Sequence, residues 1–135
     1  MKYIIYADGA SRGNPGLASC GAVIYSEGGD VLFEVSEAIG EATNNIAEYS
    51  ALVKALEVCQ KEGGADSLEI FLDSQLVVRQ VQGLYKVKEP HLKVLHAQVI
   101  KLLMDMNIAY TIAHVVREKN KEADALANQA LDALI

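Results

Sequence analysis

The chain has 135 residues, a formal net charge of −6 and 51% hydrophobic residues, a composition that is typical of one folded domain and excludes wholesale disorder. No apolar run reaches the roughly 18–20 residues that a bilayer-spanning helix needs, so we expect no membrane segment. The negative charge argues against a generic nucleic-acid binder, which is usually basic. Cys20 and Cys59 lie outside any zinc-binding spacing, so we expect two buried free thiols and a cytoplasmic protein.

The first third of the chain has the two-residue hydrophobic period of β-strands. Lys2–Ala7 alternates in this way and predicts a strand with Asp8 at its end. Gly9–Gly16 contains Gly, Asn and Pro and predicts a turn. Two further strands are expected over Ala18–Ser26 and Val31–Ala38, joined by a glycine-rich hairpin turn. These segments predict a three-stranded meander.

The hydrophobic period then changes to three and four residues, which is typical of helices that alternate with further strands. The elements expected in chain order are a helix over Asn44–Glu62, a strand over Ser67–Leu72, a short helix over Ser74–Gln82, a helix opened by Pro90, a strand over Ile108–Val116 and a closing helix after Asn120. Asp73 and Asn120 are expected to cap the helices that follow them.

This order predicts an α/β fold, a five-stranded mixed sheet (βββαβααβα) with helices on its faces, in a single domain over residues 1–135. Strands that follow crossover helices are expected to run parallel to the first strand, which brings their carboxyl ends to one edge of the sheet.

Four acidic residues stand out from the surface acids by their positions. Asp8 and Asp73 end predicted strands, whereas Glu48 and Asp124 lie in the first turns of predicted helices among small apolar residues. Each alone is equally explained by a turn, a helix cap or the helix dipole. Together they favour a metal site, because buried carboxylates need a compensating cation. Clustered oxygen ligands favour Mg²⁺ or Mn²⁺, and two such ions suit attack on a phosphodiester.

Four stretches of the chain resemble type 1 ribonuclease H, and the resemblance covers essentially the whole length. The matching stretches are Tyr6–Gly16 (YADGASRGNPG), Thr43–Tyr49 (TNNIAEY), Leu72–Val77 (LDSQLV) and His114–Asp124 (HVVREKNKEAD). The resemblance implies a ribonuclease H-like catalytic domain in which Asp8, Glu48, Asp73 and Asp124 are the catalytic metal ligands, with Asp8 bridging two Mg²⁺ ions and Mn²⁺ as a substitute.

The implied reaction is endonucleolytic hydrolysis of the RNA strand of RNA–DNA hybrids, which leaves 5′-phosphate and 3′-hydroxyl ends. A monomeric enzyme is expected, and double-stranded RNA is a second candidate substrate. The rival hypothesis is a catalytically silent nucleic-acid-binding module of the same fold. Loss of one of the four acids would favour that rival, and none of them is lost.

Contacts to the hybrid are also implied by the resemblance, since such an enzyme must recognise the RNA 2′-hydroxyl and the shape of the minor groove. The larger family members carry a basic protrusion that this chain has no room for, so lysines in the segment before Pro90 are its local positive charge. For the asparagines the alternative is a role in turns and helix starts, and for the lysines it is an ordinary solvated surface. The expected substrate-binding residues are Gly9, Ser11, Arg12, Asn14, Thr43, Asn44, Asn45, Ser74, Gln75, Lys86 and Lys88.

His114 and Arg117 are the remaining expected catalytic residues. His114 lies ten residues before Asp124, the spacing at which many family members keep a histidine that assists proton transfer or product release. The segment around Arg117 resembles a shorter prokaryotic and plant branch with the pattern HVPRExN, in which the arginine takes over some of this work. A histidine at a strand end is also often packed in the core, and the sequence leaves both roles open.

Overall fold

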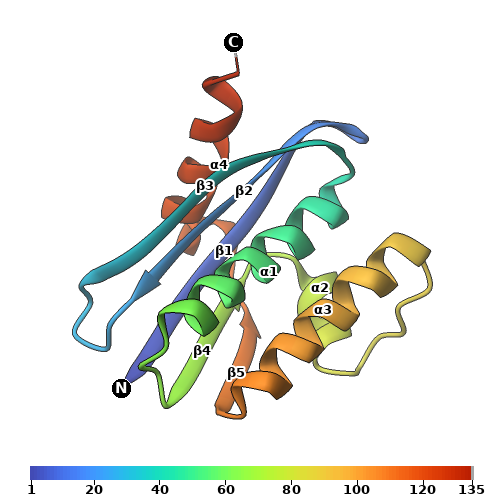
Figure 1. Ribbon diagram of the computed structural model, residues 1–135. Helices are drawn as coiled ribbons and strands as arrows, with labels where there is room; N and C mark the ends of the chain where they lie inside the picture. The colour runs from blue at the N-terminus through green and yellow to red at the C-terminus, as the bar shows by residue number, and fades with distance from the viewer. Residues whose placement is uncertain (135) are drawn as a thin grey trace.

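A computed structural model describes residues 1–134, which form a five-stranded mixed sheet with helices on both faces (Figure 1). Ile135, the last residue of the predicted domain, lies outside the described residues. The predicted order of elements is confirmed. The strands are β1 (Lys2–Gly13), β2 (Gly16–Tyr25), β3 (Val31–Ala42), β4 (Ser67–Leu72) and β5 (Ala109–His114), and the helices are α1 (Asn44–Glu62), α2 (Gln75–Val81), α3 (Pro90–Met106) and α4 (Lys121–Asp132), with a 3₁₀ turn, η1, over Arg117–Lys119.

The sheet has the strand order β3-β2-β1-β4-β5. β1, β2 and β3 pair antiparallel, whereas β4 pairs parallel with β1 and β5 pairs parallel with β4. In Figure 1, α1 crosses one face of the sheet with α3 beside it, and α4 lies on the opposite face. The expected convergence of strand ends is confirmed, because Ala7 of β1 pairs with Leu72, the last residue of β4.

The hairpin between β1 and β2 corrects the predicted turn. Gly9–Gly16 is wrong as a turn, because β1 stays paired with β2 from Gly9 opposite Cys20 to Gly13 opposite Gly16. Only the residues between Gly13 and Gly16 form the connection. The glycine at position 9 has a packing role, because a Cβ atom there would lie 2.2 Å from the carbonyl carbon of Ala47 in α1.

Helix starts in the structure depend on side chains that satisfy free backbone N–H groups. Thr43 caps α1, with its hydroxyl accepting from the Ile46 N–H at 3.2 Å. The expected Asp73 cap is wrong, because the Ser74 hydroxyl accepts from the Val77 N–H at 3.3 Å and caps α2. This leaves the carboxylate of Asp73 free for another role.

Asn120 precedes α4, but its side chain does not cap the helix, so this prediction is also wrong. The amide of Asn120 is fully buried and donates to the Ala7 carbonyl of β1 at 2.9 Å. The carbonyl of the same residue accepts from the Asp124 N–H at 3.1 Å. Asn120 therefore ties the first turn of α4 to the strand residue that precedes Asp8.

The main core lies between the sheet and α1 with α3. Its fully buried members include Ile5 and Ile70 from the sheet and Leu52 and Leu56 from α1. Burial of a large aliphatic side chain contributes about 1.5–3 kcal/mol, so this layer dominates the stability of the fold. Within residues 1–134, no helix combines the length and the apolar character that crossing a lipid bilayer requires.

On the other face, α4 lies directly against the backbone of β2 at Gly21. A Cβ atom at this position would lie 2.1 Å from the Ala123 carbonyl oxygen and 2.5 Å from the Ala127 nitrogen. Both of these atoms belong to the helix backbone, so neither can move away as a side chain could. Gly21 is also the cross-strand partner of Asp8. The absence of a side chain here therefore sets how closely α4 approaches β1 and β2.

We predict that Gly21→Ala destabilises the protein by roughly 1–3 kcal/mol or more, because the new methyl group overlaps the α4 backbone. Chemical denaturation followed by circular dichroism measures this change. Gly28→Ala is the matched control, since a Cβ atom there meets only the Ser26 hydroxyl, at 3.8 Å. Equal stability of the two variants would contradict the prediction.

Candidate active site

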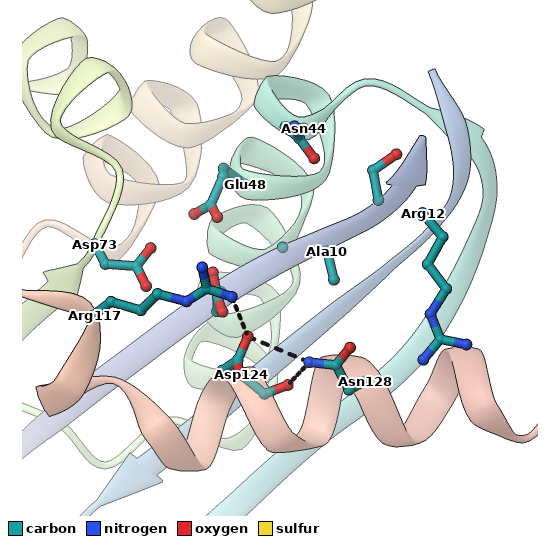
Figure 2. Close-up of a pocket in the computed structure, with 11 residues that line it drawn as sticks. Ala10, Arg12, Asn44, Glu48, Asp73, Arg117, Asp124 and Asn128 are labelled. Atoms are coloured by element: carbon teal, nitrogen blue, oxygen red, sulfur yellow. Dashed lines mark hydrogen bonds and ion pairs between the residues drawn. The ribbon is translucent and has the colours of Figure 1, made fainter. Parts of the chain in front are cut away.

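Four acidic side chains from four separate segments of the chain meet at the edge of the sheet where β4 ends (Figure 2). Asp8 comes from β1, Glu48 from the second turn of α1, Asp73 from the residue that follows β4, and Asp124 from the first turn of α4. Asp8 and Glu48 are buried, with 4% and 9% of their surfaces exposed. The structure therefore brings together all four predicted acids, which lie up to 116 positions apart in the chain.

These carboxylates line an open pocket of about 420 Å³, which we call the carboxylate pocket. Oxygen atoms of Asp8, Glu48 and Asp73 all lie within 4.8 Å of one another. The pocket is lined by Asp8, Gly9, Ala10, Ser11, Arg12, Asn44, Glu48, Asp73, Arg117, Asp124 and Asn128.

The environment of the cluster disfavours negative charge when no cation is present. Burial raises the pKa of Asp8 far above its ordinary value, and the neighbouring Glu48 and Asp73 raise it further. Burial also raises the pKa of Glu48, and the negative charges of Asp73 and Asp124 add to this effect. Shifts of this kind are expected where carboxylates are held together in a site of low polarity.

The donor set of the pocket fits divalent metal. One carboxylate oxygen of Glu48, Oε2, is buried and has no hydrogen-bond partner among the described residues. An unpaired buried carboxylate oxygen is costly unless a cation compensates it. The cluster contains oxygen ligands and no histidine or cysteine, which favours Mg²⁺ or Mn²⁺ over zinc.

Asp124 is held from two sides. Nδ2 of Asn128 donates to the Asp124 carbonyl at 3.0 Å and to Oδ1 of its carboxylate at 3.3 Å. Nη2 of Arg117 lies 3.8 Å from the same oxygen, and the Arg117 side chain is 78% exposed. Figure 2 shows these contacts as dashed lines from Arg117 and from Asn128 to Asp124. The predicted catalytic residue Arg117 therefore borders the carboxylate pocket with an exposed guanidinium.

Several of the predicted substrate-binding residues surround the carboxylate pocket. Gly9, Ser11, Arg12 and Asn44 line it. The Ser11 hydroxyl donates to the Ala42 carbonyl at 2.8 Å, and Arg12 forms an ion pair with Asp132 of α4. These side chains thus also have structural partners.

Asn14 does not line the carboxylate pocket, but it shapes the pocket's rim. This residue is exposed at the β1–β2 turn, where its Oδ1 atom accepts from the Asn44 N–H at 3.1 Å. The bond ties the turn to the start of α1. Thr43 contributes in a similar way through its cap, so both residues hold the first turn of α1 beside the pocket.

The remaining predicted contacts lie around a second pocket, which we call the lysine pocket. It is lined by Asn45, Leu76, Gln80, Leu84, Tyr85, Lys86, Lys88, Glu89 and Leu92. Asn44 lines the carboxylate pocket and the next residue, Asn45, lines the lysine pocket, so the two surfaces adjoin at the start of α1. Ser74 and Gln75 lie at the start of α2, and neither lines either pocket.

His114 lies at the end of β5, opposite Leu72. Its side chain is exposed, so the core-packing alternative is wrong. The residue does not line the carboxylate pocket, whereas Arg117 does. The structure therefore separates the two residues that the sequence grouped as catalytic helpers.

Sequence patterns missed Ala10 and Asn128, which also line the carboxylate pocket. Periodicity could have found both of them. Ala10 follows Asp8 by two residues on the same face of a strand, and Asn128 follows Asp124 by one helical turn. The prediction of a turn at Gly9–Gly16 hid the first of these relationships.

Several known proteins are similar to this chain over most of its length. The family described as reverse transcriptase-like matches residues 6–130. Ribonuclease HI from Halobacterium salinarum is 46% identical over 127 residues, which are 94% of this chain and 63% of that protein. A ribonuclease H from Clostridium botulinum is 32% identical over 146 residues, covering 97% of this chain and 96% of that protein. A bifunctional protein from Mycobacterium tuberculosis is 44% identical, and the match covers only 36% of it.

Solved structures give the same result for the fold. RNase H1 from Halobacterium salinarum superposes with a TM-score of 0.93 at 44% identity, covering 98% of this chain and 99% of that one. LC11-RNase H1, solved in complex with an RNA/DNA hybrid, superposes with a TM-score of 0.93 at 47% identity, with 98% of each chain covered. The chain thus spans whole RNase H1 structures but only about two thirds, or less, of some curated relatives.

We predict that the protein without metal becomes less stable as the pH rises. Asp8 and Glu48 have raised pKa values in the folded state, so the folded protein binds protons more tightly than the unfolded chain does. Their contribution to stability is present below the unfolded pKa and is lost as the pH rises toward the folded one. Thermal unfolding in EDTA between about pH 5 and pH 8 should therefore show a falling melting temperature.

Asp8→Asn should reduce this dependence and raise the melting temperature at neutral pH, because the amide is neutral without having to bind a proton. Asp30→Asn, in the exposed turn between β2 and β3, is the control and should leave the pH dependence unchanged. A wild-type melting temperature that is flat over this range would refute the electrostatic account.

Proposed function

Because the chain belongs to the type 1 ribonuclease H family, we propose that it hydrolyses the RNA strand of RNA–DNA hybrids. The observation that carries the proposal is the cluster of Asp8, Glu48 and Asp73, whose oxygens lie within 4.8 Å of one another. Asp124 completes the set from α4. The hybrid bound to LC11-RNase H1, a protein with the same fold and 47% identity, supports this choice of substrate.

In the proposed mechanism, Asp8, Glu48, Asp73 and Asp124 would hold two Mg²⁺ ions, and Mn²⁺ would serve as a substitute. When bound, divalent metal supplies activation of water and stabilisation of charge on the phosphate oxygens. The attacking water adds to phosphorus and the bond to the 3′ oxygen breaks, so the products carry 5′-phosphate and 3′-hydroxyl ends. The chain contributes the fixed geometry, because each acid lies in, or directly after, a different helix or strand.

We propose that the surface from the carboxylate pocket to the lysine pocket binds the hybrid. Asn44 and Asn45 lie where the two pockets adjoin, and amide side chains can both donate to and accept from a ribose hydroxyl. Lys86 and Lys88 are exposed at the far end of this surface and suit contacts to phosphate. Duplex RNA offers the same 2′-hydroxyl groups and is the second substrate to test.

Arg117 is the stronger candidate for a catalytic helper. Its guanidinium already lies beside Asp124, and its high exposure leaves it free to reach a phosphate bound in the carboxylate pocket. His114 is the last residue of β5 and lies outside the residues that line this pocket. We propose that His114 assists the release of product and takes no part in the attack on phosphorus.

Asp8→Asn should abolish cleavage, because it removes a charge that holds the metal ions together at the centre of the cluster. Losing metal-assisted attack costs several kcal/mol of activation free energy, so we expect a fall of at least about 1000-fold in rate. The assay uses end-labelled hybrid, duplex RNA and duplex DNA, each with Mg²⁺, Mn²⁺ or EDTA, and end analysis of the products identifies the cleaved bond.

Asp30→Asn, an exposed carboxylate remote from the pocket, should retain wild-type cleavage in the same assay. Hybrid binding without cleavage by the wild-type protein, in either metal, would favour the silent binding module instead. More than a tenth of wild-type activity in a folded Asp8→Asn variant would rule out the assignment of Asp8.

Changing Lys86 and Lys88 together to Ala should raise KM several-fold and leave kcat nearly unchanged. These side chains are expected to position the duplex and to take no part in the chemistry. Each lysine neutralises at most one phosphate. The slope of the logarithm of the binding constant against the logarithm of the salt concentration should therefore become shallower by about 2 at most. The measurement is KM and kcat on one labelled hybrid over a range of KCl concentrations.

The matched control is the double change of Lys61 and Lys101 to Ala, which removes the same charge from exposed positions on α1 and α3. Neither control residue lines the carboxylate pocket or the lysine pocket. If both double variants raise KM equally, the effect reflects net charge, and the hybrid does not bind at the lysine pocket.

A further inference from the structure

One face of α4 lies along one face of β1 and presents a polar residue at every turn. Asp124, Asn128 and Asp132 recur every four residues on the helix, and Asp8, Ala10 and Arg12 alternate along the strand. The two series meet at both ends, because Asp8 and Asp124 share the carboxylate pocket and Arg12 pairs with Asp132. Asn128 lies between these two points, in the pocket wall.

Asn128 holds Asp124 through two bonds that serve different purposes. The bond from Nδ2 to the Asp124 carbonyl, at 3.0 Å, fixes the amide against its own helix. The bond from the same nitrogen to Oδ1 of the carboxylate, at 3.3 Å, fixes the side chain of Asp124. Because the amide is half-buried and doubly bonded, it has little freedom to move away.

Arg117 contacts the same oxygen, but it differs from Asn128 in charge and in freedom. Its guanidinium lies 3.8 Å from Oδ1, and its side chain is largely exposed. A guanidinium and a divalent cation compete for one carboxylate, since both are positive. A neutral amide does not compete in this way, so the Asn128 bond can persist while Oδ2 remains available to a cation.

We propose that Asn128 is a positioning residue that orients the Asp124 carboxylate toward Asp8 for metal binding. The proposal rests on the proposed function only in taking the four-acid cluster as a divalent metal site. Neighbours of this kind that orient a metal ligand typically change metal affinity by 10- to 100-fold when they are removed. Asn128 acts through Asp124 and has no part of its own in the reaction.

The test is metal binding by the whole chain without substrate. Asn128→Ala should raise the Kd for Mn²⁺, measured by calorimetry, by about 10-fold. The same change should reduce the rise in melting temperature that Mn²⁺ produces. On a labelled hybrid, kcat at limiting metal should fall while KM stays unchanged. Gln129→Ala removes an exposed amide from the next position of α4 and should change none of these values.

Asn128→Ser tests the two hydrogen bonds of Asn128 separately. A serine hydroxyl can still bond the carbonyl four residues earlier, but it is too short to reach the carboxylate. The proposal therefore predicts that Asn128→Ser binds Mn²⁺ as weakly as Asn128→Ala does. Recovery of affinity in the serine variant would reduce Asn128 to a helix-stabilising residue and overturn the proposal.

Two other outcomes also overturn it. An unchanged Kd for Mn²⁺ in Asn128→Ala would mean that Asp124 needs no such support. A raised KM with unchanged metal affinity would make Asn128 a contact to the hybrid. If wild-type protein binds Mn²⁺ but cleaves no hybrid, the proposed substrate fails while the comparison of Kd values still decides the role of Asn128.

Discussion

The site depends on one constraint, the direct contact of two helices with the backbone of the central strands. Gly9 and Gly21 permit this contact on opposite faces of the sheet, at the residue after Asp8 and at its cross-strand partner. At Gly9 the backbone of α1 touches β1 next to Glu48, and at Gly21 the backbone of α4 touches β2 next to Asp124. The spacing of the carboxylates therefore follows from backbone contact, which leaves little room for adjustment.

This rigidity explains why like charges can be kept together. Repulsion among Asp8, Glu48 and Asp73 would separate flexible side chains, but each is attached to an element that is packed in place. The cluster is disfavoured in the protein alone and becomes favourable when cations bind. The packed backbone of the chain therefore sets the spacing of the carboxylates that would hold the cations.

The sequence predicted the features that depend on local patterns. It did not predict the features that depend on contacts between segments far apart in the chain. Helix α1 and strand β4 have the predicted bounds, because their periods and caps lie within the segments themselves. The extent of β1 was wrong, since its pairing with β2 and the approach of α1 keep Gly9 extended. The four acids were predictable from family motifs. The role of Asn120 was not, because its partner, Ala7, lies 113 positions away.

The reactivity of the two cysteines can report on movement of α1. Cys20 and Cys59 are 0% and 2% exposed, and burial raises the pKa of each thiol to about 12. The thiolate is the form that attacks alkylating reagents, so neither cysteine should react at neutral pH while it stays buried. Cys20 contacts Ala47 of α1, and Cys59 lies in the last turn of that helix. The rate of alkylation should thus record how often α1 lifts from the sheet, while any cysteine introduced on the surface could be labelled selectively.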